Sequence, residues 1–335
     1  MANAQPTPRD GEAFDVVLVG GGTGGYVAAI RAKQLGLDVA VVEIGKIGGT
    51  CLHQGCIPTK AYLKSADVYE EVQHSAEFGV NIAGDVTFNY PAALERSLKV
   101  VAGQYKGLQF LFDKKYNIPV AAGRGKIAGP NAVEVTPNDG GAPYTLQARN
   151  IIVDTGTRPR PIKGLDWDGK RVINSDDAVV LEQMPQSFII RGGGAVGVEW
   201  ASIYGRYGAK VSLVGRVVPA EEEEAQQVLT RAFKRQGIDL YPNSRPTADD
   251  IEVTDSGYGT YADGKSMLDY SGCTIKVPDY GVILTGGSGS GFQGPQRSRS
   301  ASADRAHGLS RFRLIGASRT RLCSGVLCAV PLNCT

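Results

Sequence analysis

The chain has 335 residues, of which 42% are hydrophobic and 21% charged, and its formal net charge is +2 at pH 7. This length is enough for about two domains, and the composition is that of a globular protein with a sizeable core. The near-neutral charge argues against nucleic acid as a partner, and no apolar run approaches the roughly 18 residues of a membrane span. Residues 1–13 lack the pattern of a secretory leader. We therefore expect a cytoplasmic protein that begins with a short disordered arm.

The most ordered pattern lies in residues 14–43. A short apolar run leads into a G-x-G-x-x-G triplet, a helical stretch and a second apolar run that ends in an acid. These parts are a strand at 16–19, the glycines Gly20, Gly22 and Gly25, a helix at 26–35, a strand at 39–42 and then Glu43. Such glycines let a pyrophosphate approach a helix N-terminus, and the acid can bind ribose hydroxyls. The unit predicts a dinucleotide site, with a structural turn as the alternative.

Cys51 and Cys56 follow within the stretch GGTCLHQGCIPTK. In a reducing compartment such a pair is typical of redox or metal sites. Residues five apart in a regular helix are about 8–9 Å apart, beyond the ~7 Å limit for the Cα atoms of a disulfide. A disulfide here requires an irregular backbone, which Gly48, Gly49, Gly55 and Pro58 allow. We favour a redox disulfide; the alternatives are inert thiols and zinc, for which His53 is the one other good ligand close by.

The middle of the chain predicts a helix and a small sheet. Residues 91–115 carry apolar residues at helical spacing, which we expect to pack in the core: Leu94, Leu98, Val101, Tyr105, Leu108 and Phe112. Residues 120–152 predict a three-strand meander broken by GPN and PNDGGAP turns.

A second glycine unit follows at residues 187–216. It comprises a strand at 188–190, the glycines Gly192, Gly194 and Gly197, a helix at 198–207 and a strand at 211–214. Two such units indicate two nucleotides, and hence electron transfer between two cofactors. The alternative is a single Rossmann domain, with the second glycine unit a repeat that binds no nucleotide.

With these motifs, residues 14 to about 280 resemble the class I pyridine nucleotide-disulfide oxidoreductases. Residues 48–69 are similar to dihydrolipoamide dehydrogenases, the E3 component of 2-oxo acid dehydrogenase complexes. The resemblance implies an α/β fold with two Rossmann-like dinucleotide-binding domains and a three-strand β-meander. It implies FAD on the first glycine unit and NAD on the second, with NADP as the alternative. Electrons would pass from dihydrolipoamide through a Cys51–Cys56 disulfide and FAD to NAD+.

The resemblance also assigns residues. Cys51 would exchange with the dithiol substrate, Cys56 would face the flavin, and Lys60 would sit beside the flavin paired with Glu199. The implied cofactor-binding residues are Gly20, Gly22, Gly25, Glu43, Gly49, Thr50, Lys60, Thr155, Gly156, Gly192, Gly194, Gly197 and Glu199. No metal site is expected. We expect an FAD-binding domain with the cysteine pair at 14–158 and an NAD(P)-binding domain at 159–285.

Three positions depart from the family pattern, and one of them is Arg191, which stands where the strand before the second glycine triplet is normally apolar. Asp154 stands where the family has a small residue, and a carboxylate buried there would be costly or have a raised pKa. Gly215 stands where NAD-using members carry the ribose-binding acid. Arg216, next to it, could suit the 2′-phosphate of NADP.

The segment from Gly286 to the end is rich in Arg, Ser and Gly and has no Lys or Glu. We interpret residues 286–335 as a disordered tail that follows a shift of reading frame, with a basic nucleic-acid arm as the alternative. The C-terminal dimerisation domain of the homodimeric family, with its His-Pro…Glu base, is expected to be absent, and His307 is no credible replacement. An NADPH-dependent disulfide or mercuric-type reductase and a non-catalytic nucleotide-binding remnant therefore stay open as functions.

Overall fold

The computed structural model describes residues 7–159, 166–243, 250–254, 258–262 and 280–284. They form two compact units. The first contains residues 7–49 and 105–156, and the second contains residues 50–104 and the described residues from 157 onward. The predicted tail at 286–335, with His307, and the predicted loss of a dimerisation domain fall outside the described residues.

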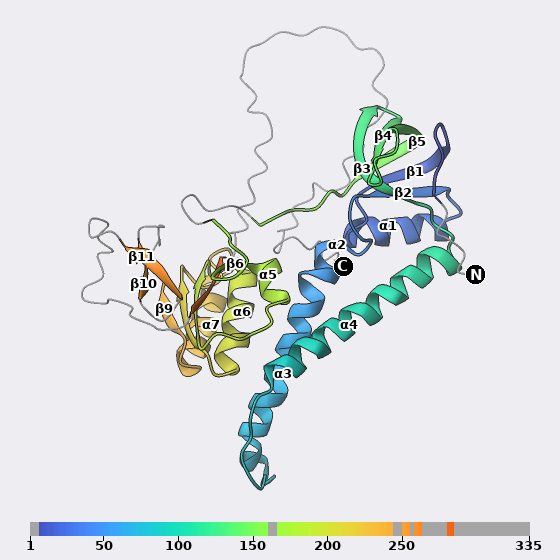
Figure 1. The fold of residues 1–335 in the computed structure, drawn as a ribbon. Coiled ribbons are helices and arrows are strands. Elements are labelled where there is room, and N and C mark those ends of the chain that lie inside the picture. The colour runs from blue at the N-terminus through green and yellow to red at the C-terminus, as the bar shows by residue number, and fades with distance from the viewer. Residues whose placement is uncertain (1–6, 160–165, 244–249, 255–257, 263–279, 285–335) are drawn as a thin grey trace. The chain divides into compact units, whose positions relative to one another are not determined.

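The first unit is built on five strands that close into a barrel in chain order (Figure 1). The strands are β1 (Ala13–Val19), β2 (Val39–Glu43), β3 (Val120–Gly129), β4 (Ala132–Pro137) and β5 (Tyr144–Val153). β1 runs parallel to β2 and to β5, and β2 runs parallel to β3. β3, β4 and β5 are antiparallel, so the predicted meander is confirmed. The meander is joined at both ends to the parallel strands and is no separate sheet.

Helix α1 (Thr23–Gln34) connects β1 to β2 and packs against both strands. The barrel encloses a small apolar core of β-branched and other apolar side chains, among them Val17, Val42, Val133 and Leu146. Because β1 and β2 are parallel, both end at the same edge of the sheet, and the glycine turn between β1 and α1 lies at that edge.

The second unit contains a five-stranded parallel sheet of order β6-β12-β7-β8-β9. Its strands and helices are β6 (Val172–Asn174), α5 (Ser175–Val179), β7 (Ser187–Arg191), α6 (Ala195–Arg206), β8 (Lys210–Val214), α7 (Glu223–Arg235), β9 (Asp239–Tyr241) and β12 (Tyr280–Leu284). A separate antiparallel pair is formed by β10 (Asp250–Thr254) and β11 (Tyr258–Ala262). The parallel order with helices in the connections is that of a dinucleotide-binding domain, as the second glycine unit predicts.

The cysteine segment leads into the second unit. Short helix α2 (Gly49–His53) is followed by α3 (Cys56–Gln73), a 3-10 turn (Ser75–Phe78) and α4 (Tyr90–Phe110), which ends in a π-helical turn (Leu111–Lys115). Residues 50–104 pack with the second unit, whereas the sequence places them in a domain at 14–158. The predicted helix at 91–115 is confirmed, but not all of its apolar stripe is core, because Leu98 is 45% exposed while Ser97 is buried.

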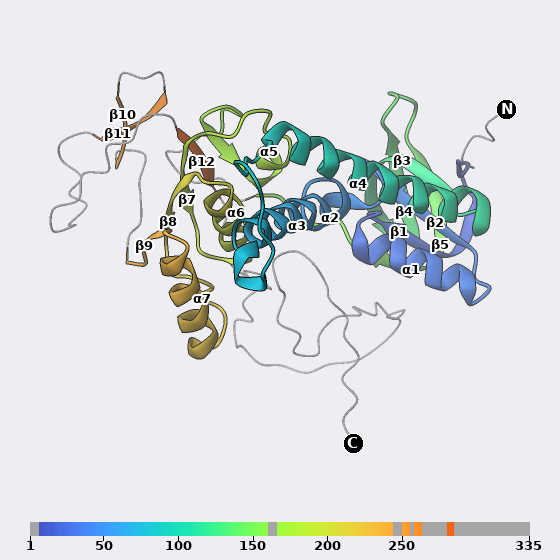
Figure 2. The same ribbon diagram turned by 90° about the horizontal axis from the view of Figure 1, so that it is seen from below.

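Helix α3 lies beside α6 (Figure 1, Figure 2), and aromatic side chains join the two helices. Trp200 and Tyr204 of α6 are fully buried, and their ring centroids lie 5.3 Å apart. The ring of Tyr62 on α3 lies 5.7 Å from that of Trp200, and its hydroxyl donates to the carbonyl of Val179 at 3.0 Å. The hydroxyl of Tyr207 donates back to the carbonyl of Tyr62 at 2.8 Å. The helix that follows the cysteines is thus held against the helix that follows the second glycine turn.

None of the helices in the described part of the chain is both long and apolar enough to cross a membrane.

Candidate functional site

The first glycine turn is shaped by close backbone contacts. Gly20 has φ +110°, and its N–H donates to the carbonyl of Val42 at 2.8 Å. A Cβ atom placed at Gly20 would lie 2.0 Å from the carbonyl oxygen of Asp154, and one at Gly25 would lie 2.0 Å from that of Gly20. At Gly22 the nearest atom would be a side-chain oxygen of Asp154 at 3.6 Å. The outer glycines are therefore required by packing, and the middle one leaves room for a ligand.

Glu43 closes the same edge at the end of β2. Its carboxylate accepts hydrogen bonds from the N–H groups of Gly21 and Gly45, both at 2.6 Å. An acid so placed beside a glycine turn can exchange backbone partners for ribose hydroxyls. The turn and Glu43 together fit the diphosphate and ribose of a dinucleotide, and Asp154 is the exception to that fit.

Gly49 and Thr155 also lie against this turn. A Cβ atom at Gly49, where φ is +58°, would lie 2.7 Å from the Cα of Gly22, and the backbone nitrogen of Thr155 is 3.1 Å from a Cβ at Gly20. Gly156 follows with φ +73° and is exposed. Three of the residues assigned by resemblance are thus brought to the first turn or next to it.

The carboxylate of Asp154 points at the start of α1. Its Oδ2 accepts the N–H of Gly25 at 2.6 Å. Burial raises the pKa of Asp154, and the charge of Glu43 raises it further, while the hydrogen bond from Gly25 opposes both. The raised pKa expected for a carboxylate at this position agrees with its surroundings.

Cys51 and Cys56 are joined as a disulfide in the break between two helices. α2 ends at His53 and α3 begins at Cys56, so the cysteines are not on one regular helix, and their Cα atoms are 4.6 Å apart. Gly55 lies in the break, and a Cβ atom there would lie 3.0 Å from the carbonyl oxygen of Thr50. The predicted disulfide with an irregular backbone is confirmed. Both cysteines are partly exposed, so a small thiol can reach the bond.

Lys60 on α3 and Glu199 on α6 form an ion pair at 2.5 Å. Their side chains are 57% and 28% exposed, and pairs in such positions add about 0–1 kcal/mol to stability. The structure therefore brings together the two residues that the resemblance pairs, and their weak effect on stability leaves room for a chemical role.

The second glycine turn is built like the first. Gly192 has φ +105° and donates to the carbonyl of Val214 at 2.9 Å. Gly194 caps α6, and a Cβ atom there would meet no atom of the described residues within 4 Å, whereas Gly197 is buried in the helix. This turn also leaves room for a ligand at its middle glycine.

The loop after β8 lies against this second turn. A Cβ atom at Gly193 would lie 2.1 Å from the carbonyl oxygen of Arg216, and Gly215 has φ +122°. A side chain at Gly215 would be strained, so the backbone itself explains why this position holds glycine and no ribose-binding acid. The side chain of Arg216 is exposed.

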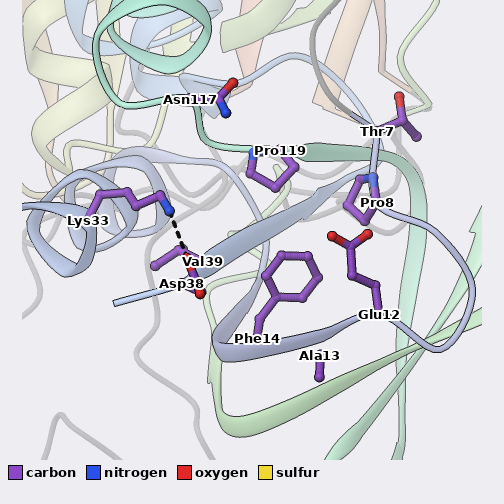
Figure 3. A pocket seen from close by; sticks show the side chains of 10 residues that line it. All are labelled: Thr7, Pro8, Glu12, Ala13, Phe14, Lys33, Asp38, Val39, Asn117 and Pro119. Atoms are coloured by element: carbon purple, nitrogen blue, oxygen red, sulfur yellow. Dashed lines mark hydrogen bonds and ion pairs between the residues drawn. The ribbon is translucent and has the colours of Figure 1, made fainter. Parts of the chain in front are cut away.

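A hollow in the first unit lies at the opposite edge of its sheet. Its lining includes Phe14 and Val39 near the starts of β1 and β2, Pro119 just before β3, and the Lys33–Asp38 ion pair (Figure 3). Ligands of α/β sheets bind at the carboxyl ends of the strands, where the glycine turn is. This hollow is therefore not the dinucleotide site.

Within the described residues, no three His, Cys, Asp or Glu side chains are grouped as a metal site.

Comparison with known proteins agrees with this geometry. Residues 14–277 match the family described as pyridine nucleotide-disulphide oxidoreductase. The chain is 42% identical over 257 residues to a dihydrolipoyl dehydrogenase of Bacillus subtilis, covering 72% of this chain and 54% of the relative. It is 40% identical over 277 residues to that of Chlorobaculum parvum, covering 81% of this chain and 58% of the relative.

A solved structure shows the same fold. It is a Cu(II) complex of the HOCl-induced flavoprotein disulfide reductase RclA of Escherichia coli, with a TM-score of 0.65 and 21% identity, covering 82% of this chain and 57% of that one. The chain spans somewhat more than half the length of these relatives. By the match over residues 14–277, this chain belongs to the pyridine nucleotide-disulphide oxidoreductase family.

Proposed function

We propose that this chain is a dihydrolipoyl dehydrogenase-type oxidoreductase that binds FAD on the first glycine turn and NAD on the second. Its electron donor is a small dithiol or a dihydrolipoyl domain, in the cytoplasm and in the service of a 2-oxo acid dehydrogenase complex. When bound, FAD would take an electron pair from the cysteines and pass it to the nicotinamide dinucleotide. The observation that carries the proposal is the partly exposed Cys51–Cys56 disulfide, which spans a helix break and whose first cysteine is eight residues after Glu43.

The residues of the chain account for the first half of the reaction. A substrate thiolate attacks the Sγ of Cys51, a substrate–Cys51 disulfide forms, and the Cys51–Cys56 bond breaks with its electron pair left on Cys56. The second substrate thiol gives up its proton, displaces Cys51 and closes the substrate disulfide. The dithiol loses two electrons and two protons, and the protein disulfide gains the two electrons.

Lys60 contributes a fixed positive charge on the helix that begins at Cys56. Because Glu199 pairs with its ammonium group, the cation is held in one place on α3. A cation so held would stabilise negative charge on the Cys56 thiolate or on a neighbouring cofactor. The general base that the family uses is not among the described residues.

A second function, NADPH-dependent reduction of a disulfide or mercuric-type substrate, is favoured by one observation. The position after β8 that would carry a ribose-binding acid is Gly215, and Arg216 beside it is exposed and able to meet a 2′-phosphate. A non-catalytic nucleotide-binding protein is the third outcome that an experiment must separate.

Thiol labelling tests the redox role of the cysteines. The full chain is treated with one equivalent of dihydrolipoamide and then with limiting iodoacetamide, and peptides are mapped by mass spectrometry. We expect label on Cys51 before Cys56, because the outer thiol is the one that meets external reagents. Cys273→Ser should leave the labelling unchanged, whereas Cys51→Ser cannot form the disulfide, so its Cys56 should be labelled with or without dihydrolipoamide.

Three further outcomes decide between the functions. Flavin retained after gel filtration, with faster oxidation of the reduced chain by NAD+ than by NADP+, supports the proposed function. Faster reduction by NADPH than by NADH supports the reductase. A chain that retains no flavin and whose disulfide does not respond to dithiols is a nucleotide-binding protein without this activity.

A further inference from the structure

Helix α1 begins without a capping side chain of its own. Its N-cap is Gly22, which makes no side-chain hydrogen bond, and the first N–H groups of any helix need partners from outside it. In an ordinary cap the N-cap side chain accepts the N–H of the second or third helical residue. Here the third residue, Gly25, donates to Asp154, which is 129 residues away in sequence.

The strand register brings this distant cap into place. β5 pairs with β1 so that Val153 lies beside Val19, and the N–H of Asp154 donates to the carbonyl of Val19 at 2.8 Å. Asp154 is therefore the first residue beyond β5 at the edge where β1 turns into α1. Its backbone is fixed by the sheet and its side chain by the helix.

The carboxylate of Asp154 occupies the space in front of the helix. A Cβ atom at Gly24 would lie 2.9 Å from its Oδ2, and one at Gly22 would lie 3.6 Å from the same atom. Glu43 holds a second N–H group of the turn, that of Gly21, at 2.6 Å. Asp154 thus holds a backbone donor of the first turn of α1 that a bound diphosphate would use, and Glu43 adds a second negative charge close by.

We propose that Asp154 is a built-in competitor of the cofactor diphosphate: its carboxylate caps α1 in the free chain and must give up the Gly25 N–H before FAD binds. The inference rests on the proposed function, because it takes the first glycine turn as the FAD site. It makes Asp154 a residue that lowers cofactor affinity and so sets the fraction of chains that carry FAD. An amide at this position would keep the cap and remove the charge.

Binding of FAD to the full chain, followed by quenching of flavin fluorescence, tests the proposal. We compare the wild type with Asp154→Asn, which keeps an oxygen acceptor, and with Asp154→Ala, which removes it. Asp15→Asn is the matched control, because Asp15 also accepts a backbone N–H, from Asp38 at 3.0 Å, near the start of β1. All four chains are measured at the same pH and at two salt concentrations.

The expected result is an FAD dissociation constant that is lower by about tenfold or more in Asp154→Asn, since a like charge next to a diphosphate is removed. The gain should shrink at high salt, which screens the charges. The dissociation constant of ADP should fall in Asp154→Asn as that of FAD does. Riboflavin, which lacks the diphosphate, should bind equally to wild type and Asp154→Asn. Asp15→Asn should bind FAD like the wild type.

Two results would overturn the proposal, and they are distinguishable. Equal FAD affinity of wild type and Asp154→Asn, with FAD bound by both, contradicts the role of Asp154 and leaves the proposed function standing. Absence of FAD binding to every variant contradicts the proposed function and the inference together. If Asp154→Ala fails to fold, Asp154→Asn still decides, because it preserves the hydrogen bond to Gly25.

Discussion

At the scale of single residues, the carboxylate of Asp154 is subject to opposing effects even without a ligand. Its hydrogen bond to Gly25 stabilises the start of α1, yet burial and the charge of Glu43 raise its pKa. Glu43 on β2 is the one other ionisable side chain of the described residues that shifts it. The charged form is therefore less stable in the folded chain than in the unfolded chain.

This conflict predicts how the stability of α1 depends on pH. The pKa of Asp154 in the folded chain is raised above its ordinary value of 3.8. The protonated carboxyl therefore contributes stability to the folded chain that is fully present below pH 3.8 and is lost as the pH rises through the folded-state pKa. We expect Asp154→Asn to protect the amides of α1 from hydrogen exchange better than the wild type at pH 7. The difference between the two chains should shrink as the pH falls.

Hydrogen exchange followed by mass spectrometry on peptides that cover α1 is the measurement, with both chains compared at each pH. Asp154→Ala, which lacks the acceptor, should be less protected than Asp154→Asn throughout. Equal protection of wild type and Asp154→Asn at pH 7 would show that the charge of Asp154 has no effect on α1.

How far the site is predictable differs from residue to residue. The glycines, Glu43 and the cysteine pair are close in sequence, so their motifs contain most of the information about them. The sequence marks Asp154 as unusual, but its partner Gly25 is 129 residues away. That contact depends on the pairing of β5 with β1, which no local pattern encodes.

At the scale of elements, the break between α2 and α3 determines whether the two cysteines are stable as a disulfide or as two thiols. Gly55 has φ −131° and ψ −110°, and it allows α3 to restart with Cys56 close to Cys51. A Cβ atom there would lie 3.0 Å from the carbonyl oxygen of Thr50 and 3.4 Å from the Cα of Cys51. Any side chain at this position pushes apart the two backbone segments that the disulfide joins.

Gly55→Ala should therefore shift the cysteines toward the dithiol form. We expect the equilibrium constant for disulfide formation in a glutathione buffer to fall by about tenfold, which corresponds to about 1.4 kcal/mol. Gly103→Ala is the control, because a Cβ atom there meets no described atom within 4 Å and alanine suits the middle of α4. A disulfide as stable in Gly55→Ala as in Gly103→Ala would contradict the argument.

The elements themselves are largely predictable, and the errors have a physical cause. Both strand–turn–helix–strand units are found where the glycines place them, but α1 begins at Thr23 and α6 at Ala195, each three residues before the predicted start. The glycines that make the turn also supply the first helical turn. In α4 the spacing of apolar residues predicts the helix, yet Leu98 is 45% exposed, because periodicity does not tell which part of a face finds a neighbour.

At the scale of the whole molecule, the two units divide the chemistry. The first glycine turn, Glu43 and Asp154 belong to the first unit, and the disulfide, the Lys60–Glu199 pair and the second glycine turn belong to the second. The cysteines group with the second unit because α3 packs on α6. Arg206 of α6 reinforces this packing: its Nη1 lies 2.6 Å from Asp67 and 3.2 Å from Glu70, and its side chain is 11% exposed.

Arg206→Met should thus destabilise the second unit and leave the first intact. It would leave the carboxylates of Asp67 and Glu70 next to each other without their cation. Both carboxylates are more than 40% exposed and stay solvated, so we expect the free energy of unfolding of the second unit to fall by no more than about 1–3 kcal/mol. Both tryptophans, Trp167 and Trp200, lie in the second unit, so tryptophan fluorescence in urea reports its unfolding.

The first unit supplies the matched control and the independent readout. Lys33→Met removes an ion pair with Asp38 in the first unit and should leave the tryptophan transition unchanged. Hydrogen exchange of α1 should be the same in Arg206→Met and wild type, and the effects of Arg206→Met and Asp154→Ala should add, as they do for distant sites. If Arg206→Met deprotects α1 as strongly as α3, the units unfold together. Cofactor affinity in the first unit would then depend on every contact that holds the cysteine helix in the second.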